Sequence, residues 1–340
     1  MVLPRRIEGV IIPTAPVIHG APNASAAGKN DNHSPGRRIP ILLQREKDDN
    51  TIENLGYHSV NVISGNGIRG LGRRIFIAYT LEVLGIEQEE LPKETVYLLF
   101  VGGATGSGYK LDKIAANTIM DVREKLPFIN LLGGTINGHF ISSVLSVDFA
   151  KPYLRETAWE NTSPFKLENP PSYNDFEAQI VSNDISYAKH EPVVTWEGKQ
   201  DEVLVVNEED VKEEGKKDRV KMLYTAEAIP AGTHLMHGFT GNPLNEDTKD
   251  TMDAFISLFI SNGYVGGWSR AGHGSFKARY YDMLTKEKYE PTIENYTKYL
   301  EANKKDIVEM LKKLPSLFPI KANEENGNKK AQNGKRRKQK

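Results

Sequence analysis

The amino-acid sequence predicts a mixed α+β fold, and three observations support this prediction. Short apolar segments with strand character alternate along the chain with amphipathic helical patterns. Glycine-rich segments stand at four of the joints between them, where the chain must turn tightly. The chain has 340 residues, 39% of them hydrophobic, which is enough for a sizeable core in one large domain or two smaller ones.

The first predicted elements are strands. Residues 7–18 form an apolar pattern that two prolines interrupt, and residues 39–44 and 60–63 follow as further strands. Between the first two strands, residues 20–37 are polar and rich in small side chains, so we expect a loop there.

The first predicted helix covers residues 67–84, with Asn66 as its N-cap and Gly85 as its end. Its apolar side chains share one face for about three turns. Arg69 and Arg73 are four residues apart and share another face, so we expect both to point away from the core.

The remaining elements follow in the order strand, helix, strands, helix, strand and helix. Residues 155–221 interrupt this order with a polar, proline-containing segment that lacks regular periodicity. The predicted strands are 95–101, 141–149, 222–229, 233–239 and 275–281, and the predicted helices are 111–126, 248–262 and 292–314.

Charge is distributed unevenly along the chain. The whole chain has a net charge of −1, but residues 321–340 carry eight lysines and arginines against two glutamates. This segment is therefore at +6, the other 320 residues sum to −7, and we expect a disordered basic tail that solubilises the protein or contacts nucleic acid.

The composition also excludes several classes of protein. Cysteine is absent, which rules out disulfides and thiolate metal sites and fits a cytoplasmic location. No run of about 18 apolar residues is present, so no membrane partner is expected. The N-terminus lacks the apolar core of a signal peptide.

The most informative segment is SGNGIRGLGRR at residues 64–74, which joins a predicted strand to a predicted helix. Its pattern Gly65-x-Gly67-x-x-Gly70 matches the dinucleotide-binding fingerprint, and backbone amides at such a joint can bind a phosphate. However, no carboxylate ends the next predicted strand, where a ribose would need one. No Gly-Lys-Ser/Thr sequence follows either, which argues against a P-loop.

Two other interpretations of this segment remain open. The glycines can simply permit a tight turn and close helix packing. Alternatively, they let a nucleic-acid backbone approach the main chain, while Arg69, Arg73 and Arg74 supply positive charge. The second interpretation gains support from GGWSRAGHG at residues 266–274, which again combines glycines with a cation and an aromatic ring.

Three motifs in this order resemble the backbone subunit of the RAMP superfamily of CRISPR-associated proteins, the Cas-seven family. ISGNGIRG at residues 63–70 is similar to the family's strand-to-helix motif. KDR at 217–219, followed by EAIPAGT at 227–233, is similar to the segment that closes the family's thumb and re-enters its palm. GGWSRAGHG at 266–274 is similar to its late glycine loop. The resemblance covers residues 7–285 and is nearest in style to the type IV subunit, then type I.

The resemblance implies an α+β fold with a modified RRM-like, or ferredoxin-like, palm and inserted finger and thumb elements. It implies that residues 1–154 form the first part of the palm with finger insertions, 155–221 the thumb, and 222–320 the rest of the palm with a C-terminal helix. The disordered basic tail covers residues 321–340.

The resemblance further implies a non-enzymatic protein that binds CRISPR RNA, polymerises along it with copies of itself, joins other effector subunits and presents the guide for pairing with target nucleic acid. No cofactor or metal is expected. The residues expected to bind RNA are Ser64, Gly65, Asn66, Gly67, Arg69, Gly70, Arg73, Arg74, Lys216, Lys217, Arg219, Trp268, Ser269, Arg270 and His273.

Two enzymatic alternatives stay open at this point. Type III backbone subunits cut target RNA with an aspartate in an early loop, and the matching loop here contains Asp31 beside His33. A dinucleotide-binding oxidoreductase would use the glycines of residues 65–70 for its cofactor.

Overall fold

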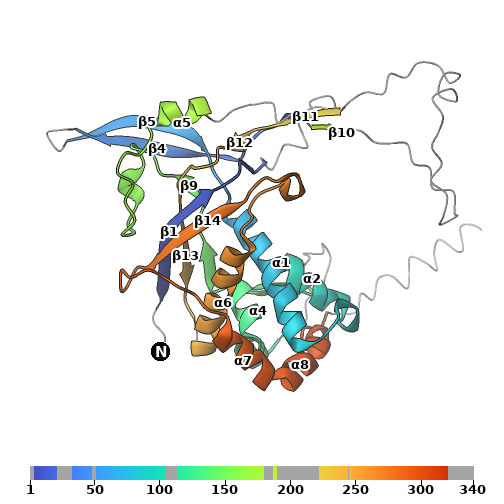
Figure 1. The fold of residues 1–340 in the computed structure, drawn as a ribbon. Helices are drawn as coiled ribbons and strands as arrows, with labels where there is room; N and C mark the ends of the chain where they lie inside the picture. Colours follow the sequence, from blue (N-terminus) through green and yellow to red (C-terminus); the bar gives the residue numbers. More distant parts are fainter. Residues whose placement is uncertain are drawn as a thin grey trace, which may run out of the picture.

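An antiparallel sheet lies at the centre of the fold, as the computed structural model in Figure 1 shows. The structure describes residues 4–20, 33–47, 51–103, 114–179, 187–189, 222–243 and 245–320. The strand order in the sheet is β14–β1–β13–β8, and β9 pairs with a further stretch of β13. These strands are β1 (Arg5–Pro13), β8 (Leu145–Val147), β9 (Lys151–Pro152), β13 (Leu235–Gly241) and β14 (Phe276–Asp282).

The connections between these strands give a ferredoxin-like topology. Along the chain, β1 is followed by helix α1, β8, β13, helix α6 and β14. If the four main strands are numbered in chain order, the sheet has the order 4-1-3-2, and all neighbours are antiparallel. This is the split β-α-β arrangement of ferredoxin-like folds, so the predicted α+β class with an RRM-like palm is confirmed.

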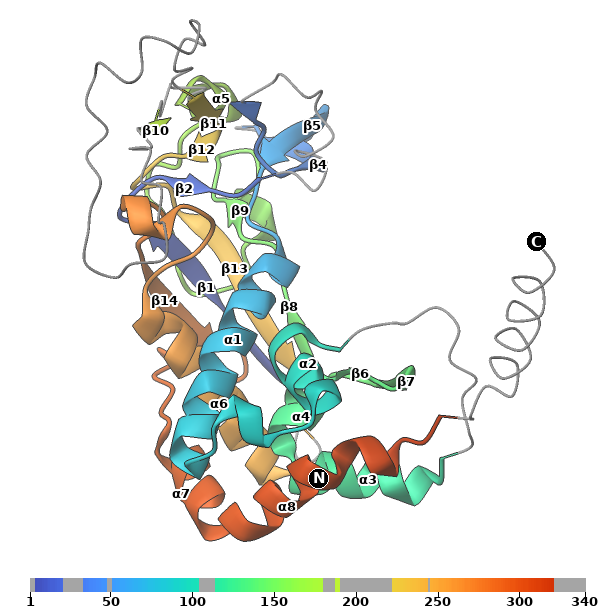
Figure 2. The same ribbon diagram turned by 90° about the vertical axis from the view of Figure 1, so that its right-hand side faces the viewer.

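Helices cover one face of the palm sheet. Helices α1 (Gly65–Leu84) and α6 (Glu246–Asn262) lie against each other on this face, as Figure 2 shows. Phe76 of α1 packs edge-on against Phe255 of α6, and Phe239 of β13 lies beneath them in the same core. The other helices are α2 (Lys93–Val101), α3 (Ala116–Lys125), α4 (Pro127–Leu132), α5 (Tyr173–Gln179), α7 (Glu294–Ala302) and α8 (Lys304–Leu317).

The opposite face of the sheet is covered by the chain that follows β9. Val10 and Met236 point to this side and form a small cluster with Tyr153 and Phe165. Typical RRM domains stack RNA bases on the open face of such a sheet. Here that face is partly occupied by the protein's own side chains.

A long hairpin extends from the body of the protein (Figure 1). It consists of β4 (Arg38–Glu46) and β5 (Ile52–Asn61) and is inserted between β1 and α1. Tyr173 of α5 packs its ring against His58 of the hairpin, with 4.8 Å between the ring centroids. The short strands elsewhere are β2 (Val17–Ile18), β3 (His33–Ser34), β6 (Gly134–Ile136), β7 (His139–Ile141), β10 (Tyr187–Lys189), β11 (Met222–Ala226) and β12 (Ala228–Ile229).

Several details of the predicted secondary structure are wrong, and three of them concern helices. The apolar run 95–101, predicted as a strand, is helix α2, because a short continuous apolar run fits a buried helix as well as a strand. The single helix predicted over 292–314 is divided at Asn303 into α7 and α8. Helix α1 begins at Gly65 rather than Gly67, because Ser64 is its N-cap.

Parts of the predicted domain organisation lie outside the described residues. The described start of the segment 155–221 contains a 3-10 turn, Ala158–Glu160, and helix α5. Residues 190–221 and the basic tail 321–340 are outside the description. Within the described part of the chain, the helices are too short or too polar to cross a lipid bilayer.

Candidate nucleic-acid interface

The N-terminus of α1 is fixed by a local cap and by a distant histidine. The Ser64 hydroxyl oxygen accepts a hydrogen bond from the Gly67 amide at 3.1 Å, which is the usual geometry of a serine N-cap. His19, at the end of β2, places its Nε2 atom 2.9 Å from the Ser64 hydroxyl and 3.1 Å from the Ser64 amide nitrogen. The Ser64 amide can only donate, so Nε2 is an acceptor in this arrangement.

The protonation state of His19 follows from the same contacts. Burial lowers the pKa of the imidazole below its ordinary value, and the nearby Arg37 guanidinium lowers it further. The neutral ring with an unprotonated Nε2 therefore predominates at neutral pH. Sequence analysis missed His19 because 45 residues separate it from Ser64 and nothing in the local pattern links them.

The glycines of α1 serve different purposes. A Cβ atom at Gly65 would lie 2.1 Å from the Val147 carbonyl oxygen, and one at Gly72 would lie 2.5 Å from the Phe255 ring. A Cβ at Gly67 would lie 2.7 Å from the His19 ring. At Gly70, by contrast, only the Arg74 guanidinium comes within 4 Å, at 3.9 Å. Close packing thus requires glycine at the first three positions and leaves Gly70 without a packing reason.

Arg73 is a structural residue, which corrects the expectation that it points away from the core. Its side chain is 8% exposed. One terminal nitrogen donates to the Leu98 carbonyl at 3.0 Å, and the other donates to the carbonyls of Leu132 and Gly133 at 2.7 and 2.9 Å. Leu98 and Leu132 belong to the last turns of α2 and α4, and Gly133 is the C-cap of α4. Carbonyl oxygens at such helix ends lack some of their intrahelical donors. The guanidinium therefore joins α1 to the C-terminal ends of two other helices.

Arg69 is partly engaged in the same way. It donates to the Leu132 carbonyl, while its Nε atom is buried with no hydrogen-bond partner in the described structure. Burial lowers the pKa of both arginines, and that of Arg73 falls to about 10 with help from the charge of Arg69. Both side chains remain charged at neutral pH, and among the described residues no carboxylate is paired with either of them.

A shallow groove runs along this flank of α1, and we call it the hairpin groove. It lies between the first turns of α1, the end of α2 and the β6–β7 hairpin. Its lining includes Asn66, Arg69, Gly70, Val101 and Phe140. Phe140 and Val101 are 70% and 63% exposed, so the outer rim of the groove is apolar.

The late glycine loop packs on β2, the strand that leads to His19. The Gly267 amide donates to the Ile18 carbonyl at 2.7 Å, and a Cβ at Gly266 would lie 2.5 Å from the same oxygen. Trp268 is half-buried against Ile18, and His273 is buried beside it, with 6.2 Å between the ring centroids. Trp268 and His273 thus help to hold the loop in place, and their contact with RNA remains a prediction.

Four residues of the late loop were predicted to bind RNA, and two of them, Ser269 and Arg270, are exposed. Together with Leu71 of α1 and Tyr264 they line a second shallow groove, which we call the loop groove. The ridge formed by exposed Gly67, half-buried Gly70 and exposed Arg74 therefore has a groove on either side. Figure 2 shows the late loop (orange) and the first turn of α1 near β2, between the end with β4 and β5 and the end with α7 and α8.

Several predicted site residues cannot be placed. Lys216, Lys217 and Arg219, predicted to bind RNA, and Asp31, the candidate nuclease residue, lie outside the described residues. Their roles remain predictions.

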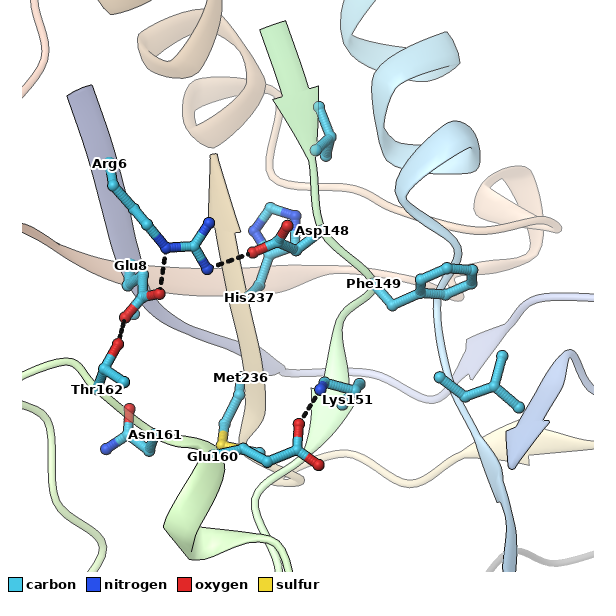
Figure 3. Close-up of a pocket in the computed structure, with 13 residues that line it drawn as sticks. Arg6, Glu8, Asp148, Phe149, Lys151, Glu160, Asn161, Thr162, Met236 and His237 are labelled. Carbon is cyan, nitrogen blue, oxygen red and sulfur yellow. Dashed lines mark hydrogen bonds and ion pairs between the residues drawn. The ribbon is translucent and has the colours of Figure 1, made fainter. Parts of the chain in front are cut away.

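A larger cavity of about 430 Å³ lies on the outer face of the palm sheet (Figure 3). Arg6 binds the carboxylates of Glu8 and Asp148, and Lys151 is paired with Glu160. Every charged side chain that lines the cavity is therefore in an ion pair, and negative charges outnumber positive ones. This cavity does not suit a polyanion.

The dinucleotide-binding alternative lacks the architecture that it requires. A Rossmann site forms at the carboxyl ends of parallel strands. Both neighbours of β1 are antiparallel to it, and α1 follows the β4–β5 hairpin. Gly65, Gly67 and Gly72 are explained by packing instead.

Comparison with known proteins finds similar solved structures. No protein-family model and no curated protein sequence matches the chain. One solved chain, titled "Type IV-B CRISPR Complex", is 23% identical, with 86% of this chain and 96% of that chain covered and a TM-score of 0.48. The chain is similar to this solved chain over most of both lengths.

Two further structures are more distant. Csc2 of Thermofilum pendens is 13% identical, with 93% of this chain and 78% of that chain covered and a TM-score of 0.31. Csm3 of Methanopyrus kandleri is 8% identical, with 82% and 75% covered and a TM-score of 0.38.

Proposed function

We propose that this protein is a CRISPR RNA-binding backbone subunit of a multisubunit effector complex. One observation carries the proposal: two glycine segments about 200 residues apart in sequence meet around β2, and they expose two cations, one on the ridge and one in the late loop. These cations are Arg74 of α1 and Arg270 of the late loop. Single-stranded RNA is bound by such combinations of cations, backbone amides and close main-chain approach.

The RNA backbone crosses the first turns of α1 from the loop groove to the hairpin groove. Gly70 lets it approach the helix closely, because the space beside this residue is open. Arg74 and Arg270 pair with phosphates, and Asn66 and Ser269 offer hydrogen bonds. Arg69 and Arg73 have a different role from the one expected from the sequence: they hold the wall of the hairpin groove.

The assembly and the remaining segments follow from the resemblance. The protein polymerises with copies of itself along the guide, binds other effector subunits and leaves bases free to pair with target nucleic acid. Residues 155–221 form the thumb, and the basic tail 321–340 adds a loose contact with RNA. The subunit acts as a scaffold without catalysis of its own.

Co-purification tests this proposal directly. We expect freshly purified protein to carry RNA, visible as a high ratio of absorbance at 260 and 280 nm that falls after RNase treatment. A nucleic-acid-free preparation that also fails to bind added RNA would contradict the proposal. Cleavage of a complementary target at regular steps, abolished by Asp31→Ala, would establish the ribonuclease alternative instead.

A double substitution tests the assignment of the two exposed arginines. Arg74→Ala with Arg270→Ala should weaken binding of a fluorescein-labelled oligouridine RNA by about tenfold or more at low salt. Because each phosphate contact contributes about 0.7 to the salt dependence of single-strand binding, the slope of log affinity against log salt should fall by about 1.4. Fluorescence anisotropy across a salt series measures both quantities.

The matched control removes two exposed lysines at the other end of the molecule. Lys298→Ala with Lys305→Ala changes the net charge equally, on α7 and α8. Equal losses in the two double variants would show that binding follows net charge rather than the proposed ridge.

A further inference from the structure

His19 connects the two glycine segments of the proposed interface. It follows β2 directly, and β2 carries the hydrogen bond from Gly267 of the late loop. Its imidazole reaches the N-cap of α1 through two contacts with Ser64. A change in the His19 side chain therefore acts on the conformation of the helix start.

The contacts of His19 require the neutral ring. With Nε2 unprotonated, the imidazole accepts from the Ser64 amide, and the Ser64 hydroxyl remains able to accept from the Gly67 amide. A proton on Nε2 turns this atom into a donor and leaves the Ser64 amide without its acceptor. A partly buried amide that loses its acceptor is destabilised, so protonation disfavours this arrangement of the helix start.

Charged groups of other segments also lie near His19. Arg37 lies close enough to repel a proton on the ring. Asn61, Glu227 and Arg37 line a small void beside His19, and the Glu227 carboxylate already accepts from the Gly36 amide at 2.9 Å and faces Arg38. Ser64 and Gly67 are the groups that face the ring from α1, and neither is titratable.

We propose that His19 is a positioning residue for RNA binding: in its neutral form it holds the start of α1 in the conformation that presents Asn66 and Gly70 to the RNA, and protonation releases it. The inference rests on the proposed function. It makes RNA affinity depend on pH through a residue that does not itself contact RNA.

The test compares pH profiles of RNA affinity for the wild type and His19→Gln. Glutamine can accept from the Ser64 amide through its side-chain oxygen but does not titrate. At constant ionic strength, we expect the wild type to bind a fluorescein-labelled oligouridine RNA about fivefold more weakly at the acidic end of the profile than at pH 7.5, since burial and Arg37 lower the pKa of His19 and delay its protonation to acidic pH. His19→Gln should change by less than about twofold. His139→Gln, which removes a partly exposed histidine whose Nε2 lies 3.0 Å from the Pro319 carbonyl oxygen, should keep the wild-type profile.

Each outcome of this test is decisive. Parallel profiles in the wild type and His19→Gln would overturn the role of His19 and leave the proposed function intact. The same conclusion would follow if the wild type bound RNA more tightly in acid and His19→Gln did not. Failure of the wild type to bind RNA at any pH would overturn the proposed function and this inference together. If His19→Gln does not fold, NMR titration of the wild-type His19 ring replaces it, and a titration midpoint away from that of the affinity change overturns the inference.

Discussion

Substitution of Arg73 by alanine should reduce the free energy of unfolding by about 3 kcal/mol or more. The guanidinium satisfies carbonyl oxygens of Leu98, Leu132 and Gly133 in a buried setting. Its removal leaves the Gly133 oxygen without a donor, while the Leu98 and Leu132 oxygens keep only the Gly102 amide and Arg69. A buried unsatisfied polar group costs about 1–3 kcal/mol, and the lost packing of the buried side chain adds to this loss. Urea denaturation followed by circular dichroism gives the change.

Two related variants make the interpretation specific. Arg74→Ala removes an exposed arginine from the next position and should change stability by less than about 0.5 kcal/mol. Arg73→Lys should recover only part of the loss, because an ammonium group cannot span the carbonyls of two helices as a planar guanidinium does. An Arg73→Ala variant as stable as the wild type would mean that this arginine is free to bind phosphate, as the sequence had indicated.

Substitution of Gly70 by leucine should separate RNA binding from folding. The space beside Gly70 is open and leucine favours helices, so the free energy of unfolding should stay the same or rise by up to about 1 kcal/mol. The added side chain occupies the position proposed for the RNA backbone, so affinity for the oligouridine RNA should fall by about tenfold or more. Anisotropy and urea denaturation on the same sample measure both effects.

Ala78→Leu is the matched control for Gly70→Leu. Ala78 is exposed on the same helix two turns further along, away from both grooves. Its substitution adds a similar apolar surface and should leave RNA affinity unchanged. If Gly70→Leu binds RNA as tightly as this control, the RNA does not cross α1 at Gly70.

The sequence was most informative about the palm. Alternating patterns and turn residues predicted the four main strands of the palm sheet, but not the register in which they pair. They also located both ends of α1 and of α6 to within two residues. The run 95–101 was misread because its burial in a helix arises from contacts with distant segments. The break at Asn303 could not be seen either, since both α7 and α8 continue the same charged and apolar pattern.

The site was predictable in position but not in the role of each residue. The two glycine segments do lie together around β2, although the glycines of the first one have ordinary helical backbone in α1. However, a helical wheel places Arg73 opposite the apolar stripe of α1 and cannot show that the ends of α2 and α4 pack against that side. The contact between His19 and Ser64 likewise exists only once β2 and α1 are placed in three dimensions.

Cross-linking of bound RNA tests the central claim most directly. Protein bound to 4-thiouridine-containing RNA is irradiated and digested, and the cross-linked peptides are identified by mass spectrometry. We predict cross-links within residues 64–74 and 266–274, on the ridge and in the late loop. Cross-links confined to β1 and β14 on the outer face of the palm sheet, with none in these two segments, would contradict the account.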